Sequence, residues 1–325
     1  MRIFVTGGNG FIGSGVVRDA IAAGHDVVCL LRATSSTDRI DGLAVTRVSG
    51  DVRDRAALER AMSDCDATIH LAAPSSWDGD SSPEVDAIIE GGTRNVLDAA
   101  STLPGHRVLL VSSLAAVNCS DTPIVFDERT AFEIRDLSLR YAHAKHRAEL
   151  AARNAFERGV PVVVVNPGEV YGPNDTAFVT AGNLVDFATS WPVLVCDGGT
   201  GVVHVDDVAH GILAALERGR PGERYILSGE NVTIRGLAEL CLELIGRRTP
   251  IVGLPNPVVR LAARAAVRLR LPAPFNPHVV PYATRYWFAD SSKAVRELGI
   301  GFRGARETIA STLGWLRDAG LMRGS

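Results

Sequence analysis

The strongest constraint on the fold is a glycine-rich turn near the N-terminus. The sequence MRIFVTGGNGFIG places Gly7, Gly10 and Gly13 at intervals of three residues, directly after an apolar run. In a strand–turn–helix unit, the first glycine permits a tight turn, the second lets a pyrophosphate come close, and the third lets the helix pack on the sheet. A helix that begins with Phe11 and Ile12 directs free N–H groups and the positive end of its dipole at the phosphates. The turn therefore predicts a dinucleotide site.

The first half of the chain alternates short β-rich runs with helical patterns. The β-rich runs are apolar throughout, which is typical of parallel strands buried on both faces. Expected strands are Ile3–Thr6, Val27–Leu31, Ala44–Val48, Ala67–Leu71, Val108–Ser112 and Val160–Val165, and expected helices are Phe11–Ala23, Arg55–Met62, Pro83–Ala100 and Leu139–Arg158. The alternation predicts an α/β fold with a doubly wound parallel sheet of the Rossmann type.

The pattern loosens after Pro167, where glycine and proline become frequent. Strands are still expected at GVVHV and GERYIL, and helices near Val208–Glu217, Ile234–Ile245, Pro257–Arg268 and Arg306–Asp318. We expect a dinucleotide-binding domain of residues 1–170 plus about 200–228, and a smaller substrate-binding lobe of about 171–199 and 229–325. The loops around Trp77, Asp121–Arg135 and Asn174–Trp191 are expected to define the substrate, whereas Trp287 is expected to lie in the core.

Composition excludes several classes of protein. With 325 residues, 46% of them hydrophobic, and a formal net charge of −3, the chain is long enough for one large α/β unit or two lobes. It has no broad basic field for nucleic acid and no apolar run of membrane-spanning length, so neither partner is expected. No charged-then-apolar leader precedes the first strand. The scattered cysteines lack CxxC spacing, which predicts reduced thiols in a cytoplasmic protein and no metal site. They are Cys29, Cys65, Cys119, Cys196 and Cys241.

The end of the second predicted strand distinguishes NADP from NAD. NAD sites usually place an Asp or Glu there to bind the ribose 2′-OH. This chain instead has Cys29-Leu30-Leu31-Arg32, without a carboxylate. A carboxylate repels a 2′-phosphate, whereas a guanidinium pairs with one through two parallel hydrogen bonds. Arg32 therefore favours NADP over NAD, the alternative interpretation being a solvated surface arginine.

The segment LRYAHAKHRAEL carries a candidate catalytic pair, Tyr141 and Lys145. Four residues apart on a helix, the two side chains lie one turn apart on the same face. Tyrosine alone, with an ordinary pKa of about 10, is a poor acid–base catalyst at neutral pH, and a neighbouring ammonium favours its phenolate. The chain has only two lysines, Lys145 and Lys293, so this spacing seldom arises by chance. The pair predicts proton exchange with a carbonyl oxygen.

Two serines, Ser112 and Ser113, end the predicted strand VLLVSS. Ligands bind at the carboxyl ends of the strands in such a sheet. A hydroxyl group at this edge holds the substrate oxygen while Tyr141 protonates it. Taken alone, the two serines are more simply explained as the end of a strand.

Six strings, in this order and at roughly these spacings, resemble the extended short-chain dehydrogenase/reductases: TGGNGFIG, HLAAP, VSSLAAV, YAHAK, NPGEVYGP and HVDDVA. The resemblance is strong over about residues 1–228, and RYILSGEN and DSSKAVRELG still resemble later segments of that family. The strings LLRATSS and SSLAAVN are most similar to the dihydroflavonol-reductase-like branch, which includes NADPH-dependent ketone reductases.

The resemblance implies a role for each matching residue. Tyr141 is the proton donor, Lys145 binds the nicotinamide ribose and lowers the tyrosine pKa, and Ser113, in preference to Ser112, orients the substrate. The implied cofactor contacts are Asp51 and Val52 at the adenine, Leu71, Ala72 and Ala73 beside the ribose, and Pro167 and Val170 at the nicotinamide end. The family also implies a homodimer formed by the two long helices predicted over 83–100 and 139–158.

Two positions depart from other branches of that family. Epimerases carry an asparagine three residues before the Gly-Thr of the central helix, where this chain has Ile89. Sugar-nucleotide dehydratases carry an acidic pair just after the serine, where this chain has Leu114-Ala115 and so lacks an acid and a base for elimination of water. We therefore expect an NADP(H)-dependent oxidoreductase acting on a small-molecule, hydrophobic carbonyl substrate. The alternatives are a sugar or nucleotide-sugar epimerase with bound NAD, and a non-catalytic NADP-sensing regulator.

The remaining polar residues of note are expected to be structural. His70 and His204 lie in strand-like runs, where a buried histidine is more often part of the core than a ligand. Asp206 and Asp207 precede a predicted helix, where N-capping is favoured over a metal site.

Overall fold

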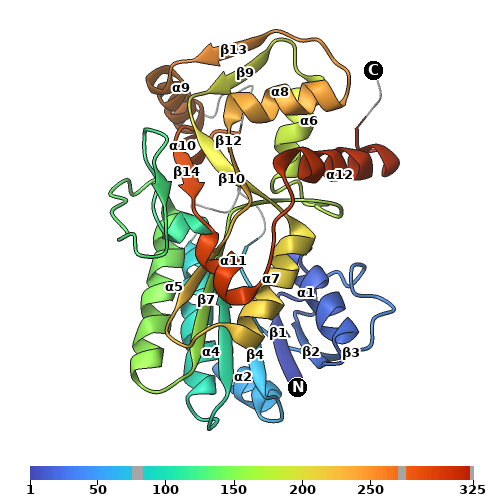
Figure 1. The fold of residues 1–325 in the computed structure, drawn as a ribbon. Coiled ribbons are helices and arrows are strands. Elements are labelled where there is room, and N and C mark those ends of the chain that lie inside the picture. Colours follow the sequence, from blue (N-terminus) through green and yellow to red (C-terminus); the bar gives the residue numbers. More distant parts are fainter. Residues whose placement is uncertain (75–82, 270–275, 323–325) are drawn as a thin grey trace.

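The computed structural model describes residues 1–74, 83–269 and 276–322. They form two halves, one above the other in Figure 1, with the N-terminus at the bottom and the C-terminus at the top of the view. Within these ranges no helix is both long enough and apolar enough to cross a membrane.

The lower half is built on a seven-stranded sheet with the order β3-β2-β1-β4-β5-β7-β11, in which every pair is parallel. Its strands are β1 Arg2–Thr6, β2 Asp26–Leu31, β3 Val45–Ser49, β4 Ala67–His70, β5 Arg107–Val111, β7 Val162–Pro167 and β11 Arg224–Leu227. The strand order reverses between β1 and β4, and ligands of doubly wound sheets bind at this switch point. The predicted doubly wound parallel sheet is confirmed.

Helices cover both faces of this sheet (Figure 1). One face carries α1 Phe11–Ala22, α7 Val205–Arg218 and α11 Ser292–Leu298, and the other carries α2 Arg55–Met62, α4 Gly92–Ala100 and α5 Arg140–Glu157. On α5 the buried residues include Ala144, Ala148, Ala151 and Ala155, which follow helical spacing. A row of small side chains lets α5 pack closely, and this positions its first turn at the edge of the sheet.

Two of the six strands predicted in the first half of the chain, the third and the sixth, differ from expectation. The run Ala44–Val48 was predicted as a buried strand, but β3 is an edge strand and largely exposed, because it has a neighbour on one side only. The run Val160–Val165 was predicted two residues too early, since β7 begins at Val162 and ends at Pro167.

The predicted helix Pro83–Ala100 is interrupted. It consists of α3 Pro83–Asp86, a π-helical turn η2 Ala87–Gly91, and α4. Two adjacent glycines, Gly91 and Gly92, weaken the helical preference at this point. The hydroxyl of Thr93 donates a hydrogen bond to the carbonyl of Ile89 at 2.6 Å and stabilises the irregular turn.

The upper half contains a five-stranded sheet and a two-stranded ribbon. The sheet has the order β12-β10-β14-β6, with β8 paired to β10, and the ribbon joins β9 to β13. The strands are β6 Val125–Phe126, β8 Glu169–Tyr171, β9 Val193–Cys196, β10 Gly199–His204, β12 Glu230–Thr233, β13 Ile251–Leu254 and β14 Tyr286–Ala289, and the helices are α6 Ala181–Thr189, α8 Ile234–Leu244, α9 Asn256–Leu269, α10 Val280–Ala283 and α12 Ala305–Asp318. A separate apolar core lies among α6, α8 and α12.

The chain passes between the two halves more often than the predicted domain boundaries imply. Residues 199–204 form β10 of the upper sheet, although the prediction assigned about 200–228 to the lower domain. In the opposite direction, α11 packs on α7 and β11 of the lower half. The exact bounds of the two parts stay a prediction.

Candidate active site

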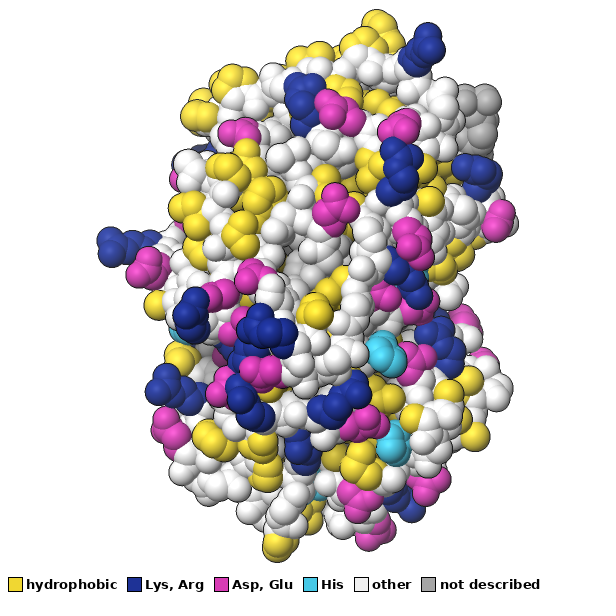
Figure 2. Space-filling model, viewed as in Figure 1, with side chains coloured by type: hydrophobic (Ala, Val, Ile, Leu, Met, Phe, Trp, Pro, Cys, Tyr) yellow, Lys and Arg dark blue, Asp and Glu magenta, His cyan; other side chains and the backbone are white. Residues whose placement is uncertain are grey.

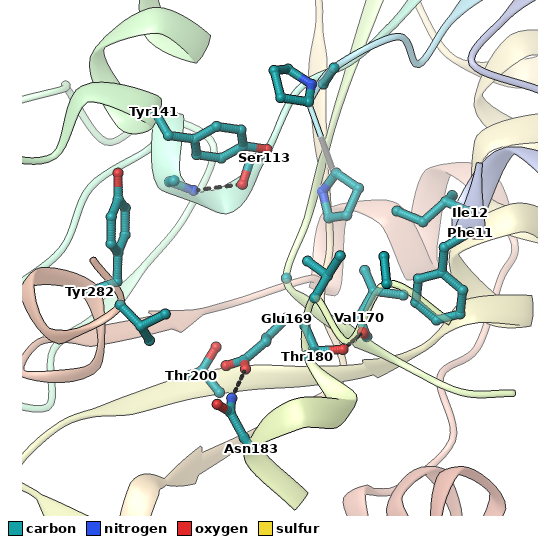
Figure 3. A pocket seen from close by; sticks show the side chains of 18 of the residues that line it. Phe11, Ile12, Ser113, Tyr141, Glu169, Val170, Thr180, Asn183, Thr200 and Tyr282 are labelled. Carbon is teal, nitrogen blue, oxygen red and sulfur yellow. Dashed lines mark hydrogen bonds between the residues drawn. The ribbon is translucent and has the colours of Figure 1, made fainter. Parts of the chain in front are cut away.

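One cavity of about 900 Å³ extends from the carboxyl edge of the parallel sheet into the upper half. Part of it is drawn in Figure 3. Every residue predicted to bind cofactor or to act in catalysis lines this cavity: Gly7, Gly10, Phe11, Ile12, Gly13, Arg32, Asp51, Val52, Leu71, Ala72, Ala73, Ser113, Tyr141, Lys145, Pro167 and Val170. The fold therefore brings these residues together, and their individual roles stay predictions.

The glycine turn has the shape that a pyrophosphate needs. Gly7 has a φ of +72°, a backbone conformation that other residues rarely adopt. A Cβ at Gly13 would overlap the carbonyl oxygen of Gly7, whereas a Cβ at Gly10 would meet only that oxygen, at 3.1 Å, and otherwise face open space. Helix α1 has no side-chain cap and no acidic residue in its first turn, so its N–H groups are ready for an anion. The residues present fit a dinucleotide.

The turn is tied to the end of β4. The hydroxyl of Thr6 accepts a hydrogen bond from the N–H of Ala72 at 3.2 Å and lies 2.7 Å from Nδ1 of His70. Burial, aided by the charge of Lys145, lowers the pKa of His70 to about 3, so the ring is neutral. The expectation that His70 is structural is confirmed by these contacts.

The predicted adenine end of the site follows β3. Asp51 pairs with Arg53 at 2.7 Å, and this hydrogen bond holds the pKa of the Asp51 carboxyl below its ordinary value. Val52 is buried, and a Cβ at Gly92 would lie 2.8 Å from its side chain. The glycine lets α4 approach the floor of this part of the cavity.

Two arginines border the cavity beyond the end of β2. Arg32 is exposed, whereas Arg39 is half-buried and donates hydrogen bonds to the carbonyls of Asn9 and Asn174 and to the hydroxyl of Thr176. Arg39 thereby links the glycine turn to the loop at 174–176. Two guanidinium groups at one end of a dinucleotide cavity fit a ligand with an additional phosphate. Sequence reasoning missed Arg39, although a second arginine seven residues after Arg32 was a readable signal.

Tyr141 and Lys145 lie on the first two turns of α5, as the sequence predicts. Lys145 is 5% exposed, its Nζ donates to the carbonyl of Val111 at 2.9 Å, and it lies 5.7 Å from the centroid of the Tyr141 ring. Burial lowers the pKa of Lys145 to about 8, an effect that the nearby Glu149 partly offsets. In Figure 3 the hydroxyl of Tyr141 points toward Ser113. The pair thus faces the cavity from one helix, with an ammonium that titrates close to neutral pH.

The two candidate serines have different surroundings. Ser113 caps a short 3₁₀ helix, η3 Leu114–Ala116, and its side chain faces the cavity beside the tyrosine ring (Figure 3). Its carbonyl accepts a hydrogen bond from Asn166 at 2.9 Å, and Asn166 also donates to Glu149 at 2.6 Å. The hydroxyl of Ser112 is buried on the side of Glu149. The geometry therefore favours Ser113 as the serine that meets a substrate.

The part of the cavity beyond Tyr141, here called the substrate half, has mainly apolar walls. These walls include Phe187, Trp191, Leu194, Val195, Ile234, Leu237, Leu254, Val259, Val280, Tyr282 and Trp287. Among the described lining residues, lysine and arginine occur only as Arg32 and Arg39, on the side of the glycine turn, and Lys145, at the junction with the substrate half. The substrate half therefore suits an uncharged ligand.

A small polar cluster interrupts these apolar walls. Glu169 accepts hydrogen bonds from the hydroxyl of Tyr171 at 2.7 Å and from the amide of Asn183 at 3.1 Å. Figure 3 shows its side chain beside Thr200 and Asn183. Burial raises the pKa of the Glu169 carboxyl and so favours the uncharged acid. Sequence reasoning included Glu169 in a family string but gave it no role.

The loops predicted to define the substrate differ in whether they line the cavity. Asn174–Trp191 contributes several lining residues, whereas Asp121–Arg135 contributes none among the described residues. The second prediction is wrong because that segment is held on the outside, where its first aspartate pairs with Arg260 at 2.8 Å and β6 joins β14. Trp287 is buried as expected, but it lies on a strand and also lines the cavity. The predicted contact of Trp77 lies outside the described residues.

The described part of the chain contains no group of three His, Cys, Asp or Glu side chains able to hold a metal ion. Asp206 and Asp207 lie inside the first turn of α7, and the cap is His204, whose ring accepts the N–H of Asp206 at 3.1 Å. The prediction that the aspartates cap this helix is wrong, because they are the second and third residues of α7 and follow the capping residue. Inside the first turn they stabilise the helix dipole instead.

Comparison with known proteins gives consistent findings. The model of the NAD dependent epimerase/dehydratase family matches residues 3–228. The chain is 30% identical over 330 residues to a protein of Synechocystis sp. named putative dihydroflavonol 4-reductase, covering 98% of this chain and 96% of that protein. It is 31% identical over 330 residues to a 4-hydroxy-2-methyl-3-oxo-4-farnesyl-3,4-dihydroquinoline-1-oxide ketoreductase of Stigmatella aurantiaca, covering 98% and 97%. The solved structure of PA4631, a nucleoside-diphosphate-sugar epimerase from Pseudomonas aeruginosa, matches with a TM-score of 0.81 at 27% identity over 99% of both chains.

Proposed function

The chain belongs to the NAD dependent epimerase/dehydratase family, within the extended short-chain dehydrogenase/reductases, and on this premise we propose that it is an NADP(H)-dependent carbonyl reductase. It transfers a hydride between the nicotinamide ring and the carbonyl carbon of an apolar ketone or aldehyde. The observation that carries the proposal is the position of Ser113, Tyr141 and Lys145, at the junction of the glycine-turn half and an apolar half of one cavity.

Each of these three side chains has a separate task. Tyr141 gives its phenolic proton to the substrate oxygen in reduction and takes it back in oxidation. Lys145 stabilises the phenolate through its ammonium, which the carbonyl of Val111 holds at the end of β5. Ser113 hydrogen-bonds the same substrate oxygen and orients it. When bound, the dinucleotide supplies or accepts the hydride.

The choice of NADP is supported by charge. Arg32 and Arg39 are the cations at the end of the cavity that follows β2, and no carboxylate ends that strand. A 2′-phosphate carries negative charge that guanidinium groups pair with directly. An NAD ribose would instead require an acceptor for its 2′-OH at this place.

The substrate class is supported by what the cavity walls contain. A nucleotide sugar brings a diphosphate, and binding one requires cationic side chains or a helix N-terminus directed at it. The described walls beyond Tyr141 carry neither lysine nor arginine, whereas apolar and aromatic side chains predominate. The ketoreductase of Stigmatella aurantiaca, which this chain resembles along its length, is named for a substrate with a farnesyl chain. An apolar ketone or aldehyde fits these walls best.

The two alternatives meet specific objections. An epimerase that works through the usual central-helix asparagine lacks it here, because the position is Ile89 and its side chain is buried. A regulator that only senses NADP has no need of a phenol and an ammonium beside the nicotinamide end. The homodimer, the lack of a nucleic-acid partner and the cytoplasmic location stay predictions from the sequence.

The proposal is tested by following NADPH absorbance with a panel of apolar ketones and aldehydes and, separately, nucleotide sugars. We expect turnover with at least one apolar carbonyl compound, and a loss of about 100- to 10,000-fold in kcat for Tyr141→Phe with the NADPH Kd unchanged. Tyr286→Phe, a buried tyrosine outside the cavity that bonds Asp197, serves as the matched control and is expected to keep its activity.

Three outcomes would contradict the proposal in distinguishable ways. Isolation of the protein with bound NAD and interconversion of nucleotide sugars indicates an epimerase. Tight NADPH binding without turnover of any carbonyl compound indicates a regulator. Full activity of Tyr141→Phe removes Tyr141 from proton transfer.

A further inference from the structure

Helix α9 has two apolar faces, and only one of them is buried. Val259, Ala263 and Ala266 pack inward. On the other side, Val258 is 57% exposed, Leu261 69% and Leu269 63%. These three follow helical spacing along one stripe of the surface. A helix of a water-exposed surface would normally carry polar residues there.

The exposed stripe continues onto the neighbouring β9–β13 ribbon. Leu194 and Val252 are opposite each other in the register of the ribbon, and both are exposed. Side chains two residues further along, Cys196 and Leu254, lie on the same face of the strands and pack against α9. Trp191, just before β9, is 74% exposed. We call this surface the apolar rim: Trp191, Leu194, Val252, Val258, Leu261 and Leu269.

The segment that carries α9 and β13 is rich in arginine, although Arg260 on α9 is paired with Asp121. From Leu244 to Ala289 the sequence contains no aspartate or glutamate and seven arginines, although the whole chain has a net charge of −3. Arg264 and Arg268 lie exposed on α9 beside the stripe, and neither has an ion pair with any described residue. In Figure 2 hydrophobic side chains gather at the top and upper left, where Figure 1 draws β13 and α9.

We propose that the apolar rim docks on the surface of an anionic phospholipid bilayer, with α9 lying in the plane of the interface. An exposed apolar stripe, an exposed tryptophan and flanking arginines are the features that hold a helix at the boundary between headgroups and acyl chains. Arginines near such a surface are attracted by anionic headgroups. A second copy of this chain fits less well, because a two-fold contact would bring the same arginines together. Docking departs from the expectation that the chain has no membrane partner, but it needs no membrane-spanning helix.

The rim also borders the cavity. Trp191, Leu194, Leu254 and Val259 line the substrate half, and the first two belong to the rim itself. A docked molecule therefore presents this wall of the cavity to the acyl phase, where an apolar carbonyl compound is concentrated. Delivery of substrate from the bilayer rests on the proposed function, whereas docking does not.

The test is co-sedimentation of the full chain with vesicles of phosphatidylcholine alone and of phosphatidylcholine mixed with phosphatidylglycerol. We expect binding to the anionic vesicles that weakens as salt is raised. Val258→Glu combined with Leu261→Glu is expected to lower binding at least about tenfold, because two apolar contacts are lost and negative charge is added. Arg264→Gln combined with Arg268→Gln is expected to lower binding about tenfold to anionic vesicles only.

The controls lie on α11, away from the rim: Val295→Glu, an exposed valine, and Arg296→Gln, an exposed arginine. Both are expected to bind vesicles like the unmodified protein, and far-UV circular dichroism checks that every variant is folded. Absence of sedimentation with anionic vesicles overturns the proposal. So does an equal loss in the α11 variants, or a concentration-dependent dimer in light scattering that Leu261→Glu abolishes. None of these outcomes bears on NADPH turnover, so the proposed function is tested separately.

Discussion

The half of the cavity at the glycine turn and the substrate half, which β9, β13 and α9 help to line, offer a ligand different kinds of contact. The first collects backbone N–H groups, glycines and the guanidinium groups of Arg32 and Arg39. The second collects apolar side chains from seven elements and one half-buried carboxyl, Glu169. A charged dinucleotide is suited to fixed dipoles and cations, whereas an apolar substrate is selected by the shape of the walls. Mutations in the first half should therefore change NADPH affinity, whereas mutations in the second half should leave NADPH affinity unchanged.

In the first half, the largest effect is expected from a substitution that adds a side chain at Gly13. Because the Cβ would overlap the backbone oxygen of Gly7, the glycine turn or α1 must move. We expect Gly13→Val to weaken NADPH binding at least about 100-fold and to lower the free energy of unfolding by about 1–3 kcal/mol. Fluorescence titration with NADPH and urea denaturation measure the two effects.

A matched glycine gives the control for this substitution. Gly314 lies inside α12, and a Cβ there would have no neighbour within 4 Å. Gly314→Ala is expected to raise the free energy of unfolding by about 0.5–1 kcal/mol with no change in NADPH affinity. Wild-type NADPH affinity in Gly13→Val would contradict the claim that this half depends on backbone shape.

A charge reversal sharpens the comparison by separating two cofactors. Arg32→Asp removes a charge-assisted hydrogen bond and repels a 2′-phosphate. We expect NADPH to bind about 10- to 100-fold more weakly, and NADH to change far less. Isothermal titration with both cofactors measures this, with Arg296→Asp on α11 as the control. Equal losses for NADPH and NADH would refute the NADP assignment and leave the glycine-turn site intact.

The first half could be predicted from the sequence because its residues are neighbours in the chain. The glycines, Arg32 and the Tyr141–Lys145 pair each follow a strand or lie on one helix, and parallel strands bring their carboxyl ends to one edge. The spacing of these residues along the chain is therefore enough to predict how they lie relative to one another in the site. Arg39 was missed because its contacts with Asn9 and Asn174 depend on how two loops meet.

The second half could not be predicted in the same way. Glu169, Trp287 and the walls from α6 and α9 converge only after the upper sheet has assembled from segments scattered between residues 125 and 289. A carboxyl in the string NPGEVYGP gives no sign of its burial. The predicted loop Asp121–Arg135 failed for the same reason, since its pairing with β14 is a tertiary event.

A mutation at Glu169 tests whether the polar cluster holds the second half together. Glu169→Leu removes the carboxyl oxygen that accepts hydrogen bonds from the hydroxyl of Tyr171 and the amide of Asn183. We expect a loss of about 1–3 kcal/mol in the free energy of unfolding, because the Tyr171 hydroxyl stays buried, whereas the half-buried amide of Asn183 still has the Tyr171 oxygen at 3.4 Å. Glu169→Gln keeps an acceptor oxygen and is expected to lose less than about 1 kcal/mol. Urea denaturation measures both, and NADPH affinity should be unchanged in each.

The same pair of variants has a pH signature. The pKa of Glu169 is raised in the folded protein, so its contribution to stability is fully present below the unfolded pKa and is lost as the pH rises through the folded value. Glu169→Gln has no such loss, and its stability relative to the wild type should rise with pH. A difference between the two proteins that stays constant with pH would show that the carboxyl is not held in its acid form.

The smallest predicted effect concerns Lys145, which lies where the two halves meet. Burial lowers its pKa to about 8, so the ammonium is present below that pH and is lost above it. Reduction needs the ammonium beside Tyr141, and we expect kcat/KM to fall about tenfold per pH unit once the pH exceeds about 8. Lys145→Arg keeps its charge and should show a flat profile there, even if its maximum is lower. The depressed pKa also predicts that wild-type stability rises with pH above 8, because the unfolded chain then binds more protons, and Lys145→Met should lack that rise. An unchanged fall in activity in Lys145→Arg would assign the titration to another group and leave the lysine only a binding role.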